Sequence, residues 1–133
     1  MKRILVAYDG GAPAQRALAT GIKLAKQFGA SISVVSVIPS YAGRIPTEAW
    51  DDGAVHANQL QEARDILAAN GLEAELLEPS GDPAKAIERV VEVGGFDTVV
   101  LGSRGLGAIS RFLQRSVSEH VATHTKATVV ISR

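Results

Sequence analysis

Several features that would narrow the choice of function are missing from this sequence of 133 residues. It contains no cysteine, which excludes disulfides and thiolate metal sites. Lysine plus arginine balance aspartate plus glutamate at 14 each, so no strong net charge draws the chain toward nucleic acid or an anionic membrane surface. We therefore expect a small molecule or another protein as the partner, and no nucleic acid.

Long hydrophobic runs are also missing. The apolar runs, of which ISVVSVI is typical, are far shorter than the stretch of about 20 residues that spans a bilayer. The amino-terminal segment MKRILVAYDG enters a strand pattern without a cleavable apolar stretch. The sequence therefore predicts no membrane span and a cytoplasmic location. No repeat, low-complexity tract or linker divides the chain, so residues 1–133 are predicted to form one domain.

What is present is a succession of short apolar runs separated by helical patterns. The runs show little alternation, which is typical of strands covered on both faces. They occupy residues 4–8, 32–38, 74–78, 98–102 and 127–132. Because strand–helix–strand connections are almost always right-handed, we predict an α/β fold with a doubly wound, five-stranded parallel sheet. The expected strand order is the flavodoxin- or Rossmann-like 3-2-1-4-5, with a ligand crevice where the order reverses.

The helical segments carry start and stop signals. The first has an apolar stripe formed by Ala17, Leu18, Ile22, Ala25 and Phe28. Gly29, Gly71 and Gly94 stand where helices are expected to end. Asp82 followed by Pro83 fits an N-cap and the first helical residue. Residues 39–58, which hold two prolines, two glycines and the only tryptophan, are predicted to be a loop leading into the second helix.

The most informative segment, VVLGSRGLGAISRFLQRSVSEHV, begins in the fourth predicted strand. Gly102 and Gly105 keep the backbone bare where a ligand can approach, and successive free N–H groups can cradle an anion. Ser116 and Glu119 have the spacing of a capping box, which predicts that the last helix begins at Ser116 with a phosphate site at its start. Three arginines surround this segment: Arg104, Arg111 and Arg115. The alternative is that the glycines are ordinary turn residues and Ser116 an ordinary cap.

A second candidate lies at the end of the first predicted strand, where Asp9 precedes two glycines. Its carboxylate is expected at the same edge of the sheet as the glycine segment. There it can accept hydrogen bonds from a ribose or base, or assist a metal bound to phosphates. The alternative is a plain aspartate at the start of a helix. Val37, near the end of the second strand, can supply an apolar wall for adenine or belong simply to the core.

Taken together, these residues resemble the universal stress protein family over essentially the whole chain. The resemblance is carried by VAYDG, VVSVI, SGDPAKAI, FDTVVLGSRGLG and TVVIS, in that order along the sequence. ATP-binding members of the family carry Gly, two residues, Gly, nine residues, then Gly followed by Ser or Thr. Gly102, Gly105 and Ser116 match this spacing, whereas Arg115 stands in place of the third glycine.

The resemblance implies a site for ATP or AMP, with Mg²⁺ beside the phosphates left open. By this resemblance Ala7 and Asp9 border the adenosine, Val37 contacts adenine, Gly102 and Gly105 line the ribose and phosphates, and Ser116, Val117 and Ser118 hold the phosphate tail. Leu101, Arg104 and Arg115 complete the expected nucleotide-binding residues. Two roles are open for Arg115: its side chain can obstruct the phosphates, or its guanidinium can bind them.

The resemblance further implies a stress-response regulatory protein without dedicated catalysis, which acts on an unidentified protein. A homodimer is expected through Thr128, Val129, Val130 and Ile131, because this last strand is apolar and lacks the lysines or prolines that block pairing at sheet edges. The alternatives are a slow ATPase and a ligand-free interaction module with a closed nucleotide site. No metal site is predicted: His120 and His124 have i, i+4 spacing, but no third ligand lies at a readable spacing, so both are expected to be exposed helix residues.

Overall fold

The computed structural model describes residues 1–39, 49–102 and 112–133, and for residues 39, 49–56 and 112–116 it describes the backbone alone. Along the chain the elements are β1 (Arg3–Ala7), α1 (Ala12–Phe28), β2 (Ser31–Val35), β3 (Ile38–Pro39), α2 (Ala49–Ala69), β4 (Ala74–Leu77), β5 (Ser80–Gly81), α3 (Pro83–Gly94), β6 (Thr98–Gly102), α4 (Phe112–His124) and β7 (Thr128–Ser132). None of the helices in the described ranges combines the length and the apolar character needed to cross a bilayer.

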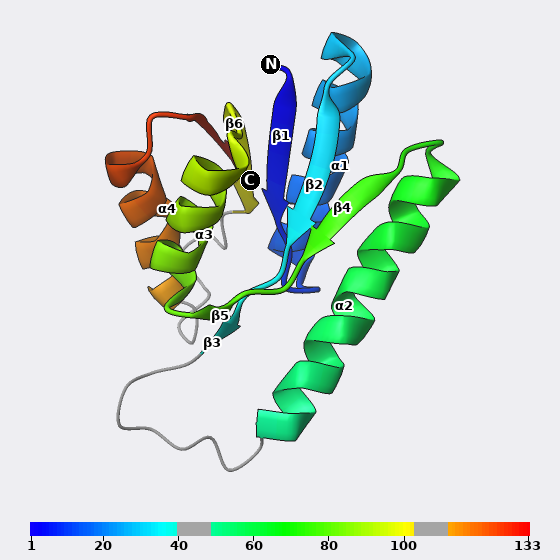
Figure 1. Ribbon diagram of the computed structural model, residues 1–133. Coiled ribbons are helices and arrows are strands. Elements are labelled where there is room, and N and C mark those ends of the chain that lie inside the picture. The colour runs from blue at the N-terminus through cyan, green and yellow to red at the C-terminus, as the bar shows by residue number, and fades with distance from the viewer. Residues whose placement is uncertain (40–48, 103–111) are drawn as a thin grey trace.

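The predicted sheet is confirmed. Its five strands are all parallel and lie in the order β4-β2-β1-β6-β7, which is 3-2-1-4-5 when these five are numbered along the chain (Figure 1). Central strand β1 pairs through Val6 with Val34 of β2 on one side and with Val100 of β6 on the other. Such interior strands are covered on both faces, which explains their unalternated apolar sequences.

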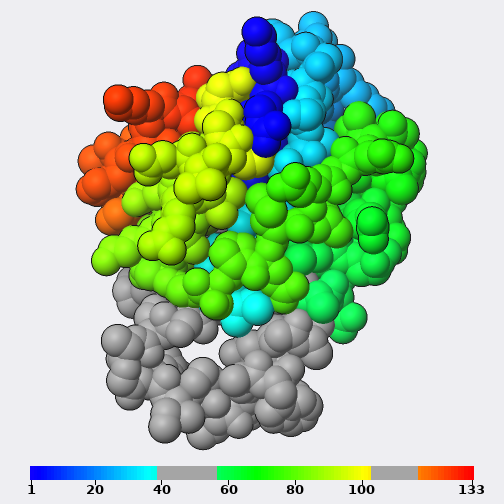
Figure 2. All heavy atoms as spheres, viewed as in Figure 1, coloured from blue at the N-terminus to red at the C-terminus, as the bar shows by residue number. Residues whose placement is uncertain are grey.

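Helices cover the sheet on both faces. Side chains of β1 alternate between two hydrophobic clusters: Ile4 and Val6 pack with residues of α1 and α2, whereas Leu5 packs with residues of α3 and α4. Figure 1 shows α1 and α2 on one side of the sheet and α3 and α4 on the other. The surface formed by these layers is seen in Figure 2, where α3 in yellow-green adjoins the orange and red carboxyl-terminal part of the chain.

Three of the five expected strands have ends that differ by one residue, and two segments differ by more. The run 32–38 is divided: β2 ends at Val35, and Ile38 of β3 pairs with Ser80 of β5 in a separate two-stranded sheet. The predicted loop 39–58 is wrong from residue 49 onward, because α2 already begins at Ala49. The segment from Ala49 contains several good helix formers, and a single glycine inside a helix costs only about 1 kcal/mol. Residues 40–48 of that loop lie outside the described ranges.

The helix signals were mostly right. Asp82 caps α3 by accepting the Lys85 N–H at 3.1 Å, and Gly29 ends α1 in the left-handed conformation with φ of +64°. For α3, however, the left-handed cap is Gly95 and not Gly94. Gly94 is still helical, and a Cβ there would lie 2.4 Å from the Phe96 ring, so close packing requires its small size.

The apolar stripe of α1 is buried as far as Ala25. Its last predicted member, Phe28, is exposed at the end of the helix. Gly71, the third expected stop, does take a positive φ of +74°, two residues after the end of α2. The prediction for the end of α2 is therefore confirmed. The buried stripe of α1 ends at Ala25 and does not include Phe28.

Candidate functional site

The carboxyl ends of the central strands form one edge of the sheet, and several predicted site residues lie along it. Ala7 ends β1, Gly102 ends β6, and Val37 follows β2 by two residues. The strand order reverses between β1 and β6, because the chain moves outward from β1 through β2 and β4 and then returns to the other side of β1. In open α/β sheets, such a switch point is where ligands bind.

Asp9 lies in the turn between β1 and α1. Its Oδ1 accepts a hydrogen bond from the Gly11 N–H at 3.0 Å. Gly10, between them, has φ of +81°, a conformation that favours glycine. The N-cap of α1 is Gly11, so Asp9 precedes the helix and is not its capping residue. Asp9 therefore holds the turn closed while its half-buried carboxylate stays at the carboxyl edge of the sheet.

Tyr8, next to this turn, is a residue that no sequence motif singles out. Its side chain is 2% exposed, and its hydroxyl donates to Oε1 of Glu62 on α2 at 2.7 Å. Burial, together with this hydrogen bond and the Glu62 charge, raises the pKa of the Tyr8 hydroxyl well above its usual value. The neutral hydroxyl therefore links α2 to the end of β1. No local pattern could have paired two residues that are 54 positions apart.

The apolar members of the predicted site come together on one face of the sheet. Ala7, Val37 and Val117 are half-buried and pack against the cluster between the sheet and the α3–α4 layer. Leu101 belongs to the buried part of that cluster, with 3% exposure. Its side chain is therefore core, whereas Ala7 and Val37 retain accessible apolar surface at the edge of the sheet.

Gly102 has a structural reason to be glycine. A Cβ at this position would lie 2.3 Å from the carbonyl oxygen of Pro13, in the first turn of α1. Its φ is not among the positive values, so the requirement is for space and not for a left-handed backbone. The bare Cα lets α1 begin directly against the end of β6, as in other α/β units where a glycine permits close helix–strand packing.

The last helix begins earlier than its capping-box pattern predicted. α4 begins at Phe112, which places Ser116 in its second turn. The segment FLQR before Ser116 contains leucine, glutamine and arginine, which are good helix formers, so the helix extends upstream of the apparent cap. Since only the first four N–H groups of a helix lack an internal partner, those of Ser116, Val117 and Ser118 belong to the helix ladder. The predicted start of the last helix at Ser116 is therefore wrong, and a phosphate there would not meet free helix N–H groups of these three residues.

Other predicted residues of the phosphate end are described less fully. Arg104 and Gly105 lie outside the described residues, and Arg115 and Ser116 are described by their backbone alone. Ser118 is buried. The structure thus places Ala7, Asp9 and Val37, the residues predicted for the adenosine end, along the same edge of the sheet. The predicted phosphate end is placed only by the course of the α4 backbone.

A comparison with known proteins gives the family. Residues 1–133 match the family model described as Universal stress protein family. The chain belongs to the universal stress protein family. A family relative from Thermus aquaticus, a universal stress protein encoded in the 3′ region of a QAH/OAS sulfhydrylase, is 33% identical; the match covers 99% of this chain and 98% of the relative.

Solved structures of universal stress proteins share the fold. The protein from Archaeoglobus fulgidus in complex with dAMP has a TM-score of 0.79 at 21% identity, over 100% of this chain and 98% of that chain. A universal stress protein in complex with cAMP has a TM-score of 0.79 at 24% identity, over 99% and 97% of the two chains. A family protein from Arabidopsis thaliana with AMP bound has a TM-score of 0.75 at 21% identity, over 99% and 91%. These likenesses show the fold.

Proposed function

We propose that this universal stress protein binds an adenine nucleotide, ATP or AMP, at the carboxyl edge of its sheet and acts as a regulatory protein without dedicated catalysis. The observation that carries the proposal is that a carboxylate, Asp9, and two half-buried apolar residues, Ala7 and Val37, lie along the carboxyl edge of the sheet beside the topological switch point. Support comes from solved family structures in complex with cAMP, AMP and dAMP.

At the adenosine end, the two kinds of side chain have complementary tasks. Val37 and Ala7 offer an apolar surface on which an adenine ring can pack. Asp9 offers a charged acceptor for ribose hydroxyls or for an amino group of the base, and a hydrogen bond to a charged group contributes about 1.5–3 kcal/mol. Because Asp9 already closes a turn with Gly11, the carboxylate is held at the edge before a ligand arrives.

At the phosphate end, the earlier start of α4 changes how phosphates are held in this proposal. Since the backbone N–H groups of Ser116 and Val117 bond within the helix, the proposed contacts are side chains: the Arg115 guanidinium and the Ser116 hydroxyl. Gly102, Arg104 and Gly105 remain the proposed lining of the ribose and phosphates. Mg²⁺ accompanies the phosphates when ATP is the ligand.

Calorimetry of the purified chain with ATP and with AMP tests the proposal. We expect one nucleotide to bind per chain. Because ATP carries more negative charge, Arg115→Ala should weaken ATP about tenfold and AMP less, and it should reduce the salt dependence of ATP binding. Arg89→Ala, which removes an exposed arginine on α3, is the matched control and should leave both affinities unchanged. Tighter ATP binding by Arg115→Ala would show that Arg115 obstructs the site, and an absence of binding by the native chain would contradict the proposal.

The absence of dedicated catalysis is tested separately, by phosphate release from ATP at steady state. We expect release no faster than in a sample of the Asp9→Asn variant. Release that requires the Asp9 carboxylate would instead make the protein an ATPase, with Asp9 acting on the metal or the attacking water.

The proposal includes a homodimer formed through β7. This strand pairs with β6 on one side and is the last strand of the sheet on the other. Ile131 is 43% exposed on it, and Val129 and Val130 are half-buried. An apolar edge strand without lysine or proline is suited to pair with a second copy.

Light scattering at micromolar concentration tests this interface. We expect the native chain to be a dimer and Ile131→Lys to be a monomer, because a lysine at the sheet edge opposes pairing. Val93→Lys alters an exposed apolar residue on α3 and serves as the control that should remain dimeric. A monomeric native chain, or a dimer unaffected by Ile131→Lys, would contradict the proposal.

A further inference from the structure

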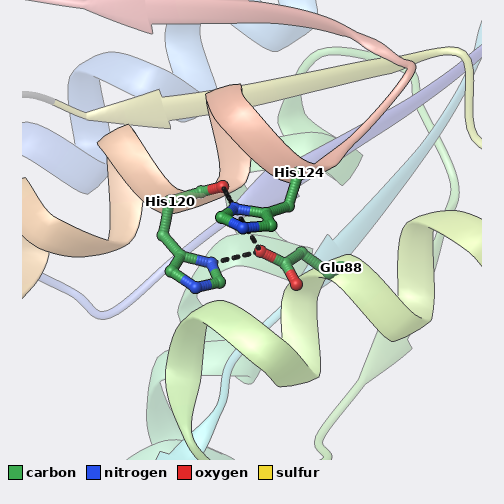
Figure 3. Close-up of side chains that lie close together, drawn as sticks. All are labelled: Glu88, His120 and His124. Atoms are coloured by element: carbon green, nitrogen blue, oxygen red, sulfur yellow. Dashed lines mark hydrogen bonds and ion pairs between the residues drawn. The ribbon is translucent and has the colours of Figure 1, made fainter.

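The two histidines of α4 have a partner that the sequence did not reveal. His120 and His124 are one turn apart on α4, and Glu88 extends from the neighbouring helix α3 toward both rings (Figure 3). Glu88 is 32 residues from His120 in the sequence, so no local spacing could have indicated it. Both histidines are partly exposed, as expected from the sequence, but the structure adds a third side chain that no sequence spacing indicated.

The three side chains form one compact group. Nδ1 of His120 is hydrogen-bonded to Oε1 of Glu88, and Nδ1 of His124 lies 4.0 Å from the same oxygen. The two imidazole rings are stacked, with centroids 4.0 Å apart and planes 16° from parallel. Nδ1 of His124 also lies 2.9 Å from the carbonyl oxygen of His120; because that oxygen can only accept, Nδ1 donates and Nε2 carries the lone pair of the neutral ring.

The donor set fits a divalent transition metal. Each side chain offers one ligand atom, and these atoms all lie within 4.8 Å of one another. Bonds of 2.0–2.2 Å in a tetrahedral site place ligand atoms about 3.3 Å apart, so the group must contract modestly to hold an ion. Among the described residues, this is the one cluster of three histidine or acidic side chains that meets so closely.

The position of the cluster allows both the contraction and the approach of an ion. The side chains of His120 and His124 are 37% and 53% exposed, and that of Glu88 is 21% exposed. The imidazoles are therefore reached by solvent and have room to shift, whereas Glu88 is the most buried of the three side chains. Two imidazoles and one carboxylate leave a position for water, and imidazole-rich sites favour Zn²⁺, Cu²⁺, Ni²⁺ and Co²⁺ over Mg²⁺ or Ca²⁺.

We propose that Glu88, His120 and His124 form a surface site for a divalent transition metal, typified by Zn²⁺, that joins α3 to α4. The site uses one imidazole nitrogen from each histidine and one carboxylate oxygen. Bound metal would fix the carboxyl-terminal turn of α4 against the middle of α3. The inference stands apart from the proposed nucleotide function, because none of its three residues belongs to the proposed nucleotide site.

Calorimetry of the chelator-treated protein with ZnCl₂ tests the site. We expect one Zn²⁺ per chain and a loss of affinity of at least tenfold in each of Glu88→Gln, His120→Gln and His124→Gln. The chain has only three histidines and no cysteine, so His56→Gln on α2 is the matched control and should bind as the native chain does. Because His124 is the most exposed of the three, His124→Gln is the variant least able to disturb folding.

A second measurement tests the link between the helices. Zn²⁺ should raise the melting temperature of the native chain and of His56→Gln by several degrees, and EDTA should reverse the increase, because an ion that binds only the folded state stabilises it. His124→Gln should melt like the native chain in EDTA and show no increase with Zn²⁺. The proposal is overturned if the native chain fails to bind Zn²⁺ at one ion per chain, if His124→Gln binds as tightly as the native chain, or if His56→Gln loses affinity equally.

Discussion

Two aspartates at opposite edges of the sheet make different use of their carboxylates. Asp97, directly before β6 at the amino edge, accepts the N–H groups of Lys2 and Arg3 at 2.7 and 3.0 Å through Oδ2 and the Thr98 hydroxyl at 2.7 Å through Oδ1. Asp9, at the carboxyl edge, accepts the N–H of Gly11 from its own turn. The first carboxylate joins segments that are 94 and 95 positions apart, whereas the second closes a local turn.

The difference separates a carboxylate that joins distant segments of the fold from one that lies at the edge where we propose that the nucleotide binds. Burial raises the pKa of the Asp97 carboxyl, but the hydrogen bonds from Thr98, Lys2 and Arg3 outweigh this, and its pKa is lowered below the usual value. The fold is therefore stabilised by the charge of Asp97. The hydrogen bond that closes the turn at Asp9 uses an acceptor oxygen, which an asparagine also has, so Asp9→Asn tests the role that we propose for the charge.

The largest expected effect is a loss of stability on substitution of Gly102. This residue lies at the carboxyl edge, where close packing against α1 leaves no space for a side chain. Gly102→Ala places a Cβ 2.3 Å from the Pro13 carbonyl oxygen and should lower the free energy of unfolding by about 2–3 kcal/mol, which is typical of overpacking. Urea denaturation measures the loss. Gly29→Ala, where nothing lies within 4 Å of the added Cβ but φ is positive, should cost about 1 kcal/mol. Equal losses would refute the packing explanation.

The next largest expected effect is on AMP affinity, which should fall when Asp9 is changed and not when Asp97 is changed. Asp9→Asn keeps the acceptor for Gly11 but removes the charge, so it should weaken AMP about tenfold, a loss of about 1.4 kcal/mol. Asp97→Asn should leave the AMP affinity within twofold of the native value. Calorimetry on both variants checks this, and equal losses of affinity would remove the distinction between the edges.

Substitution of Asp97 should instead lower the free energy of unfolding, by an amount that depends on pH. A carboxyl whose pKa is lowered in the folded state stabilises the fold above its unfolded pKa of about 3.9, and the contribution is lost as pH falls through the lower folded value. Asp97→Asn should therefore cost about 1 kcal/mol at pH 7, a figure kept small because the side chain is exposed. In urea denaturation the difference from the native chain should shrink below pH 4. Asp65→Asn, at an exposed position on α2, is the control and should show neither effect.

The smallest effect is expected from Tyr8, which joins the carboxyl edge to α2. Tyr8→Phe removes the hydroxyl that donates to Glu62 and should lower the free energy of unfolding by about 0.5–1 kcal/mol, because Glu62 can turn to water. Glu62→Gln keeps an acceptor oxygen and should cost less. Thermal denaturation of the two variants tests this order, and a larger loss in Glu62→Gln would show that the Glu62 charge has another role in the fold.

The fold could be predicted from the sequence because its signals are local and repeated. Unalternated apolar runs mark interior strands such as β1 and β6, and caps such as Asp82 and Gly29 mark helix ends. The short strands β3 and β5 could not be predicted, since two residues leave no periodic pattern. The start of α4 was placed a turn too late because the S-x-x-E spacing of a capping box can also occur inside a helix.

The candidate site could be predicted only in part, because some of its residues meet across the packed layers and leave no local sequence signal. Asp9 and its glycines form a turn signature that can be recognised in the sequence, and the structure places them at the predicted edge. The partners of Tyr8 and His120 come from α2 and α3, so only the packed layers bring them together. Gly102 suggested ligand approach, whereas the structure shows close contact with Pro13 of α1. A bare glycine in a sequence thus does not reveal which neighbour requires it.

A titration with AMP followed by amide chemical shifts in an NMR spectrum of the ¹⁵N-labelled protein tests the central claim most directly, because it compares the two edges in one experiment. The account predicts shifts for the amides of Asp9, Gly10 and Val37 at the carboxyl edge, and none for Lys2, Arg3 and Asp97 at the amino edge. Shifts centred on the amino edge, or none at Asp9 and Val37 at saturating AMP, would contradict it.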